Sequence, residues 1–121
     1  MRPLLFALAA VVCLGRTAAA QDPVKVDPKH HKVEAENDQV RVLRISIGPG
    51  EKTPVHEHPA IVVVYLNDSH NRVSPVGGKP DETPRKGGTA VAMPATKHVV
   101  ENIGTTPAEI IVVELKARPA K

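Results

Sequence analysis

The sequence predicts an all-β domain, built as a sandwich or a closed barrel. Twelve prolines and eight glycines separate short runs that are rich in valine and isoleucine. Many short strands with turn residues between them are typical of these two architectures. Beyond residue 20, no stretch keeps a 3.6-residue hydrophobic period for longer than two turns, which argues against helices. The chain has one tyrosine and no tryptophan, so we expect an aliphatic core.

Residues 1–20 have the three parts of a secretory signal peptide. A basic start at Arg2 is followed by an apolar run over residues 4–14, and three alanines at 18–20 form a small-residue cleavage pattern. The apolar run is too short to span a bilayer stably. We therefore expect cleavage after Ala20 and an exported protein, periplasmic or extracellular if its source is bacterial. No membrane association is expected once the signal is removed.

Removal of this signal changes the charge and the cysteine content of the chain. Taking Arg2 and Arg16 from the 16 basic residues leaves 14, against 13 acidic residues. A formal charge near +1 gives no electrostatic reason to expect a nucleic-acid or membrane partner. Cys13 leaves with the signal, so the remaining domain must be held by its hydrophobic core rather than by a disulfide.

The N-terminal part of the remaining chain gives weak signals. Residues 21–29 are polar and contain prolines, and we expect a poorly ordered lead-in there. His30 and His31 follow between lysines and are interpreted as a surface pair, because a second metal site would need partners that the sequence does not offer. The predicted organisation is a lead-in with a first short strand at 21–38, the main domain at 39–115 and a polar tail at 116–121.

The strands follow from runs of β-branched residues between turn residues. Residues 39–47 alternate charged and β-branched side chains, and Gly48-Pro49-Gly50 ends that run with turn chemistry. Residues 108–115 form a long apolar strand, which we expect to be buried; the alternative is an edge strand that pairs two copies into a homodimer. The expected strands cover residues 32–37, 39–47, 53–66, 72–76, 89–93, 98–103 and 108–115.

Two histidines lie one residue apart near the start of the 53–66 strand. Side chains alternate faces along a strand, so His56 and His58 must point the same way. Buried imidazoles without partners are costly, so a metal, a water chain or a third polar side chain must bond them. The same alternation places four apolar residues on the inner face with the pair: Ala60, Val62, Val64 and Leu66.

A later strand supplies a third histidine. From His98, the strand period brings Val100 and Asn102 to the same face, with Met93 across the preceding turn. Three histidines with open coordination positions make a usable site for a divalent transition metal, which could be Fe, Mn, Ni, Cu or Zn. The candidate metal ligands are His56, His58 and His98.

The frame around these histidines resembles the two halves of the cupin signature. The first half reads Gly50, five residues, His56, one residue and His58; the second reads Gly88, five residues, Pro94, a turn to His98, three residues and Asn102. The resemblance covers about residues 39–115 and is to small single-domain bacterial cupins of RmlC-like type. It implies a jelly roll, the double-stranded β-helix barrel, with a metal held between its two sheets.

The chain departs from the cupin pattern in two places. Cupins usually carry a glutamate ligand four or five residues after the second histidine, where Val62 and Val63 stand here. The resemblance then implies three histidine ligands and one more open position, which favours softer transition metals. Thr96 stands where the turn before His98 usually has glycine, so we expect a turn of different shape.

The resemblance implies a class of functions rather than one reaction. The first expectation is a metal-dependent enzyme of dioxygenase or isomerase type, acting on a small-molecule substrate. The alternatives are a non-catalytic module that binds a small apolar ligand, and a degenerate cupin without metal. No acid–base pair or nucleophile stands out. His70 lies in a turn of small polar residues and is expected to be exposed, with a place at the rim of the pocket as the alternative, and Glu57 is expected at the surface.

Overall fold

The structure is a computed structural model that describes residues 21–117. The predicted signal peptide at residues 1–20 lies outside this range, as do the last four residues of the predicted polar tail. Within residues 21–117, no helix is long and apolar enough to cross a membrane.

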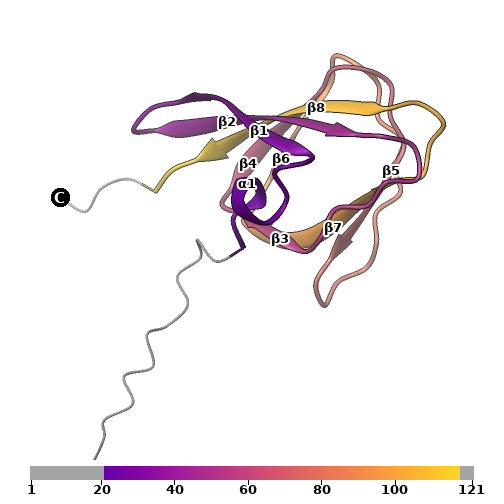
Figure 1. Cartoon of the computed structure of the whole chain (residues 1–121), viewed down its shortest axis with the longest axis horizontal. Helices are drawn as coiled ribbons and strands as arrows, with labels where there is room; N and C mark the ends of the chain where they lie inside the picture. The colour runs from indigo at the N-terminus through magenta and orange to yellow at the C-terminus, as the bar shows by residue number, and fades with distance from the viewer. Residues whose placement is uncertain (1–20, 118–121) are drawn as a thin grey trace, which may run out of the picture.

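The all-β prediction is confirmed, because eight strands and one short helix make up the fold. The strands form two antiparallel sheets, one in the order β1-β2-β8-β4-β6 and one in the order β3-β7-β5. The two sheets enclose a common interior, and α1 contacts β1 of one sheet and β3 of the other (Figure 1). The elements are α1 (Pro23–Val26), β1 (His31–Glu36), β2 (Val40–Ile47), β3 (His56–His58), β4 (Ile61–Tyr65), β5 (Asn71–Pro75), β6 (Ala90–Met93), β7 (Thr96–Asn102) and β8 (Ala108–Leu115).

The last strand is at the centre of the larger sheet, as the sequence predicts. β8 pairs with β2 along its whole length and with β4 on its other side. Its side chains alternate between buried and partly exposed positions, with Ala108, Ile110, Val112 and Glu114 facing inward. Because both edges of β8 are occupied, this strand cannot pair two copies of the chain.

The core is aliphatic, which confirms the prediction from composition. It lies on the inner face of the larger sheet, where three strands each supply three buried side chains. These residues are Leu43, Ile45 and Ile47 of β2, Ile61, Val63 and Tyr65 of β4, and Ala108, Ile110 and Val112 of β8. Burial of such side chains is the main source of stability for a domain without a disulfide.

The strand expected at 53–66 is two strands in two different sheets. β3 pairs with β7 in the smaller sheet, and β4 pairs with β6 and β8 in the larger one. Pro59 and Ala60 form a bend between them, since proline cannot donate to a sheet and has a fixed φ. The bend shifts the alternation by one residue, so Ile61 and Val63 point inward. The prediction that Ala60, Val62, Val64 and Leu66 face the interior is therefore wrong.

The lead-in has defined structure, contrary to the expectation of poor order. Asp22 caps α1 by accepting a hydrogen bond from Val24 N at 2.9 Å, and Pro23 occupies the first turn, where its missing N–H costs nothing. The chain then turns through Asp27 and enters β1 at His31, which pairs with Ile45. The short helix therefore determines where His31, the first residue of β1, is placed.

Two glycines of the cupin frame have backbone conformations that other residues avoid. Gly50 has φ +77° and Gly88 has φ +84°. Within residues 21–117, no residue other than glycine has a positive φ, so Thr96 enters β7 with ordinary strand geometry. The turn before His98 thus differs from a glycine turn, as the departure at Thr96 predicts.

Candidate metal centre

Four buried histidines from three strands converge at one end of the barrel interior. His56 and His58 of β3 both point inward and are 1% and 2% exposed, as alternation predicts. The register of β3 with β7 pairs His56 with His98, which is 5% exposed. His31, the first residue of β1, reaches the same place from the larger sheet and is 3% exposed. The sequence prediction brought three of these four residues together.

The ring nitrogens of this cluster are close enough to one another to coordinate a single ion. His31, His56 and His58 each offer a ring nitrogen, and these three atoms lie within 4.8 Å of one another. Nε2 of His98 lies 3.1 Å from Nε2 of His56. The ring centroid of His56 is 4.9 Å from that of His31, 5.0 Å from that of His58 and 4.7 Å from that of His98. His56 is therefore the centre of the cluster.

The interpretation of His30 and His31 as a surface pair is wrong. His30 is 7% exposed and lies between two carboxylates, with Nδ1 2.9 Å from Asp27 Oδ2 and Nε2 3.0 Å from Glu51 Oε2. His31 faces the opposite way, into the histidine cluster. The other residues of β1 are exposed, so hydrophobic alternation gave no signal that this strand contributes to the interior.

Three of the four histidines have an oxygen acceptor at Nδ1. Nδ1 of His31 lies 3.1 Å from the carbonyl of Asp27, and Nδ1 of His56 lies 3.0 Å from the carbonyl of Pro54. Nδ1 of His58 lies 2.7 Å from Oε2 of Glu114. An acceptor at Nδ1 requires the proton there, which leaves Nε2 with its lone pair for a metal. This is the outer-shell arrangement that metal-binding histidines commonly have.

His98 has a different environment. Its Nδ1 is buried and has no hydrogen-bond partner within the described part of the chain. In the absence of metal, its Nε2 must donate to His56, because the proton of neutral His56 is already on Nδ1. A buried ring with one nitrogen unpartnered costs about 1–3 kcal/mol. His98 is thus held less firmly than its three neighbours.

Burial keeps His31, His56 and His98 neutral near pH 7. Loss of solvation lowers the pKa of His56 to about 4, and the carbonyl of Pro54 only partly offsets this. Loss of solvation, together with the neighbouring histidines, lowers the pKa of His98 to about 3. Burial also lowers the pKa of His31. Neutral imidazole is the form that binds metal, so protons do not compete for these three rings at neutral pH.

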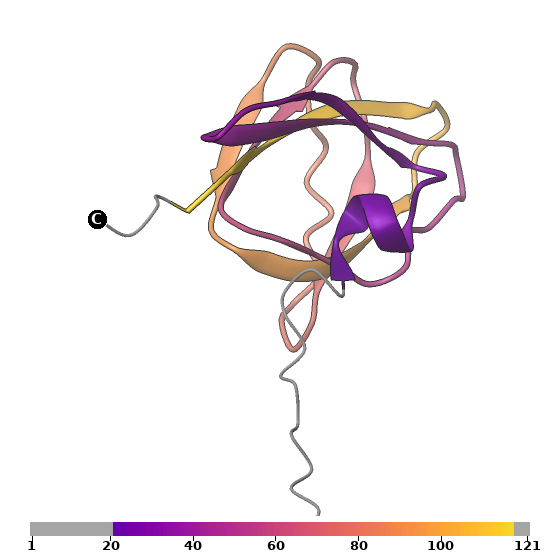
Figure 2. The same cartoon turned by 60° about the vertical axis from the view of Figure 1, so that its left-hand side comes forward.

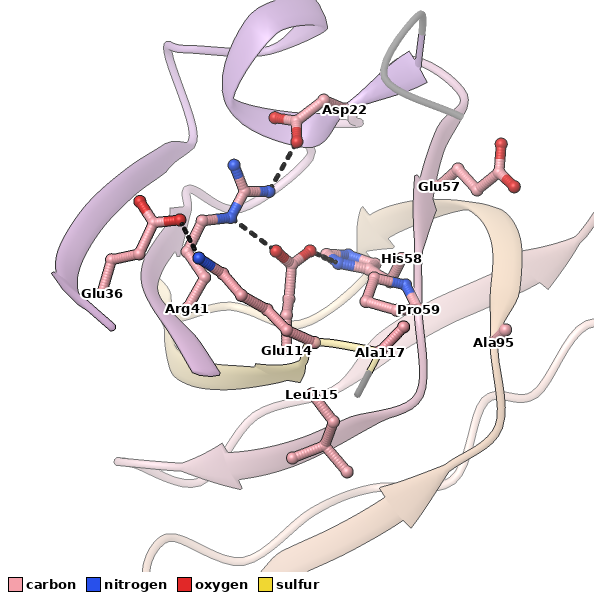
Figure 3. A pocket seen from close by; sticks show the side chains of 11 residues that line it. Asp22, Glu36, Arg41, Glu57, His58, Pro59, Ala95, Glu114, Leu115 and Ala117 are labelled. Atoms are coloured by element: carbon pink, nitrogen blue, oxygen red, sulfur yellow. Dashed lines mark hydrogen bonds and ion pairs between the residues drawn. The ribbon is translucent and has the colours of Figure 1, made fainter. Parts of the chain in front are cut away.

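A carboxylate that the sequence reasoning assigned to no site contacts this cluster. Glu114 of β8 is 3% exposed; its Oε2 accepts from His58, and its Oε1 accepts from Arg41 Nε at 2.6 Å. Arg41 in turn donates to Asp22 Oδ2 at 2.7 Å, so the contacts run from α1 to the cluster (Figure 3). Burial alone would raise the pKa of Glu114, but the hydrogen bonds from His58 and Arg41 lower it. The available signal was an acidic residue at an inward position of an apolar strand.

The remaining candidates lie away from the cluster. His70 is half-buried, and its Nε2 lies 2.8 Å from the carbonyl of Glu82, far along the chain from β3. Asn102 faces inward as predicted, but its Nδ2 donates to the carbonyls of Ile47 and Thr106, each at 2.8 Å, so it fixes the backbone at the other end of β7. Glu57 is half-buried rather than fully exposed.

Three spaces adjoin the histidines: two border His58, and the third is a surface pocket of about 570 Å³ beside His30 and His31. The first is a cavity of about 50 Å³ inside the barrel, which all four histidines and the aliphatic core line. The second is an open surface pocket of about 440 Å³ that His58 and Glu114 border, with Arg41 and Glu57 at its sides (Figure 3). The interior cavity is far below the 300–1,000 Å³ typical of organic-ligand sites, whereas both surface pockets lie within that range.

The fold is similar to solved structures of cupin proteins. A cupin domain from Bordetella pertussis Tohama I has a TM-score of 0.66 and 25% sequence identity, over 72% of this chain and 92% of that chain. An RmlC-like cupin family protein with a double-stranded β-helix fold, from Methanocaldococcus jannaschii, has a TM-score of 0.58 and 22% identity, over 74% and 83%. The polyketide cyclase RemF from Streptomyces resistomycificus has a TM-score of 0.56 and 22% identity, over 74% and 66%.

The comparisons confirm the fold class that the histidine and glycine frame implied. No family model matches the sequence, and no curated protein matches it. The likeness is therefore one of structure, with the two facing sheets of a cupin double-stranded β-helix visible in both views (Figures 1 and 2).

Proposed function

We propose that this chain is a small exported cupin-fold protein that binds one divalent transition-metal ion in its histidine cluster. The observation that carries the proposal is the convergence of buried imidazoles from three strands, three of which offer ring nitrogens within 4.8 Å of one another. The ligands would be His31, His56, His58 and His98, which adds His31 to the three that the sequence suggests.

The residues fit such an ion in three respects. First, the distance of 3.1 Å between Nε2 of His56 and of His98 suits two nitrogens on one ion, because two bonds of about 2.0–2.1 Å at roughly 90–110° separate the nitrogens by about 2.9–3.4 Å. Second, the acceptors at Nδ1 of His31 and of His58 leave Nε2 free. Third, burial keeps the rings of His56 and His98 unprotonated.

The donor set limits which ion is held. Neutral imidazoles suit Zn, Cu, Ni and Fe, and Mn to a lesser degree, whereas Ca²⁺ and Mg²⁺ require oxygen ligands. Val62 is half-buried and Val63 faces inward, and neither can supply a carboxylate to the ion. When bound, the ion would supply Lewis-acid polarisation of a ligand oxygen and, for Fe, Mn or Cu, redox chemistry.

Catalysis of dioxygenase or isomerase type is the finer part of this proposal. With four imidazoles as ligands, two coordination positions stay open in an octahedral ion and one in a five-coordinate ion. The interior cavity of about 50 Å³ admits only molecules of a few atoms, so an organic substrate would approach from the open pocket beside His58. One of the proteins with a similar fold is the polyketide cyclase RemF, which is compatible with a small-molecule substrate for this chain.

The second candidate function is a non-catalytic cupin module, with or without metal. The size of the interior argues against an apolar ligand of ordinary size within the barrel. A metal-binding module without turnover is supported by the scarcity of acid–base groups facing the cluster, since Glu114 is held by Arg41 and His58.

The metal content of the purified protein tests the proposal. We expect near-unit stoichiometry of one transition metal by elemental analysis, and loss of that metal in His56→Ala, which removes the central ring. Metal-free protein should take up Zn²⁺ or Ni²⁺ with a rise in melting temperature. If the wild-type protein holds no metal and neither ion shifts its melting temperature, the metal-binding function is wrong. If metal is bound, oxygen consumption with phenolic and small-acid substrates separates an oxygen-consuming enzyme from a binding module.

A further inference from the structure

Glu114 is a buried acid whose two oxygens contact two different groups, a histidine of the cluster and an arginine outside it. We propose that Glu114 is the positioning residue of the metal centre, holding His58 with its proton on Nδ1 and its Nε2 directed at the ion. The usual cupin glutamate after the histidine pair is missing here, and the carboxylate of Glu114 on the last strand takes a different part. It bonds the metal ligand His58 rather than the metal. This inference rests on the proposed function, but its first test does not require metal.

The surroundings of Glu114 are built to hold a charged carboxylate. A buried carboxylate is costly unless donors face its oxygens. Oε2 receives the 2.7 Å bond from His58, and Oε1 receives the 2.6 Å bond from Arg41 Nε. Arg41 stays protonated at any pH at which the protein folds, so its guanidinium keeps Glu114 ionised. Glu114 therefore can only accept hydrogen bonds.

Arg41 is itself held in place from the N-terminal helix. Its NH2 group donates to Oδ2 of Asp22 at 2.7 Å, while Oδ1 of Asp22 caps α1 through Val24 N. Arg41 of β2 also lies directly opposite Glu114 of β8 in the register of these two paired strands. The side chain that orients Glu114 is therefore fixed at both ends (Figure 3).

An acceptor-only group at Nδ1 determines what His58 presents to the cluster. With Glu114 in place, the proton must sit on Nδ1, and Nε2 offers a lone pair. Without it, the proton can move to Nε2, where it points at the other histidines and must be displaced before an ion binds. The loss of the 2.7 Å bond also frees the ring to rotate about its side-chain torsions. Both effects lower metal affinity without removing a ligand.

The competing explanation is that Glu114 only stabilises the barrel through its ion pair with Arg41. That role would change the melting temperature but not the tautomer of His58. Glu109 provides a matched control, because it lies on the same strand, faces outward and accepts a hydrogen bond from Ser46 at 2.6 Å.

The test uses the mature protein with ¹⁵N-labelled histidine. In metal-free wild type and Glu109→Gln, we expect the His58 nitrogen shifts of an Nδ1–H tautomer; Glu114→Ala should shift His58 toward Nε2–H. Glu114→Gln has one oxygen for two donors; if Arg41 Nε takes it, the amide NH2 faces Nδ1 of His58 and should also move the proton toward Nε2. Zinc affinity, measured against a chelator, should fall about 10–100-fold in Glu114→Ala, at least about threefold in Glu114→Gln, and stay unchanged in Glu109→Gln.

Each result bears on one of the two proposals. If Glu114→Ala keeps the Nδ1–H tautomer and the wild-type zinc affinity, the positioning role is wrong. If Glu114→Ala does not fold, an unchanged zinc affinity in Glu114→Gln overturns it. If no form of the protein binds zinc, the metal function fails, while the tautomer in metal-free protein still decides the role of Glu114.

Discussion

Replacing His31 with alanine perturbs the member of the metal centre that lies outside the sequence motif. The side chain is 1% exposed, and its ring stands 4.9 Å from that of His56. His30 provides the matched control, since it is also buried and bonded to Asp27, but its second nitrogen faces Glu51 instead of the cluster. The two alanine variants therefore remove similar buried rings, and only one of them removes a ligand.

The expected loss of affinity follows from the number of ligands. Histidine- and cysteine-bound structural zinc has a binding free energy of about 10–16 kcal/mol, so each of four ligands contributes about 3–4 kcal/mol if the contributions are equal. Loss of one ligand would then weaken binding by roughly two to three orders of magnitude. Loss of the Nδ1 contact should lower the free energy of unfolding by about 1 kcal/mol in His31→Ala, where the acceptor is the Asp27 carbonyl, and by about 1–3 kcal/mol in His30→Ala, where the buried Asp27 carboxylate loses its partner.

Competition with a chromophoric chelator gives the zinc affinity, and chemical denaturation of metal-free protein gives the stability. We expect His31→Ala to lose about 100–1,000-fold in zinc affinity and His30→Ala less than about fivefold, although His30→Ala loses at least as much stability. Equal affinities for the two variants would refute the assignment of His31 as a ligand. The centre would then consist of the three histidines that the sequence motif suggests.

Three further predictions concern the metal-free fold. Acid should destabilise it between about pH 6.5 and pH 3, because His56 and His98 have folded-state pKa values of about 4 and about 3 and bind protons more readily once unfolded. Urea unfolding at pH 7.5 and pH 5.0 measures this loss of stability. Equal stabilities at the two pH values would contradict the prediction. Leu43→Ala should lower the free energy of unfolding by about 2–5 kcal/mol while leaving zinc affinity unchanged, since Leu43 is fully buried in the aliphatic core. Gly50→Ala should cost only about 1 kcal/mol in the same assay, because a Cβ there meets no atom within 4 Å and only the positive φ opposes it; a loss above about 3 kcal/mol would contradict this.

Local pattern was sufficient to predict the fold class and part of the site. Valine-rich runs between turn residues predicted the strands, and the one-residue spacing of His56 and His58 predicted that both face inward. The frame from Gly88 to Asn102 led to His98, whose register against His56 places the two rings in contact. These features depend on neighbours in sequence, which a single chain displays directly.

The rest of the site depends on contacts between distant strands. His31 and Glu114 reach the cluster only because β1 and β8 belong to the sheet that closes over β3, and each stands in a strand whose own pattern indicates something else. β1 is otherwise exposed, and β8 is otherwise apolar. The bend at Pro59 also exchanged the inner and outer residues of β4, since a shift of one residue reverses every side chain of a strand.

A crystal of zinc- or nickel-loaded protein, measured at the absorption edge of the metal, tests the central claim most directly. We predict one anomalous peak per chain, located between the rings of His56 and His58 and within bonding distance of His31 and His98. A fully loaded crystal with its peak elsewhere on the chain, or with no ordered peak, would contradict the assignment of this histidine cluster as a metal centre.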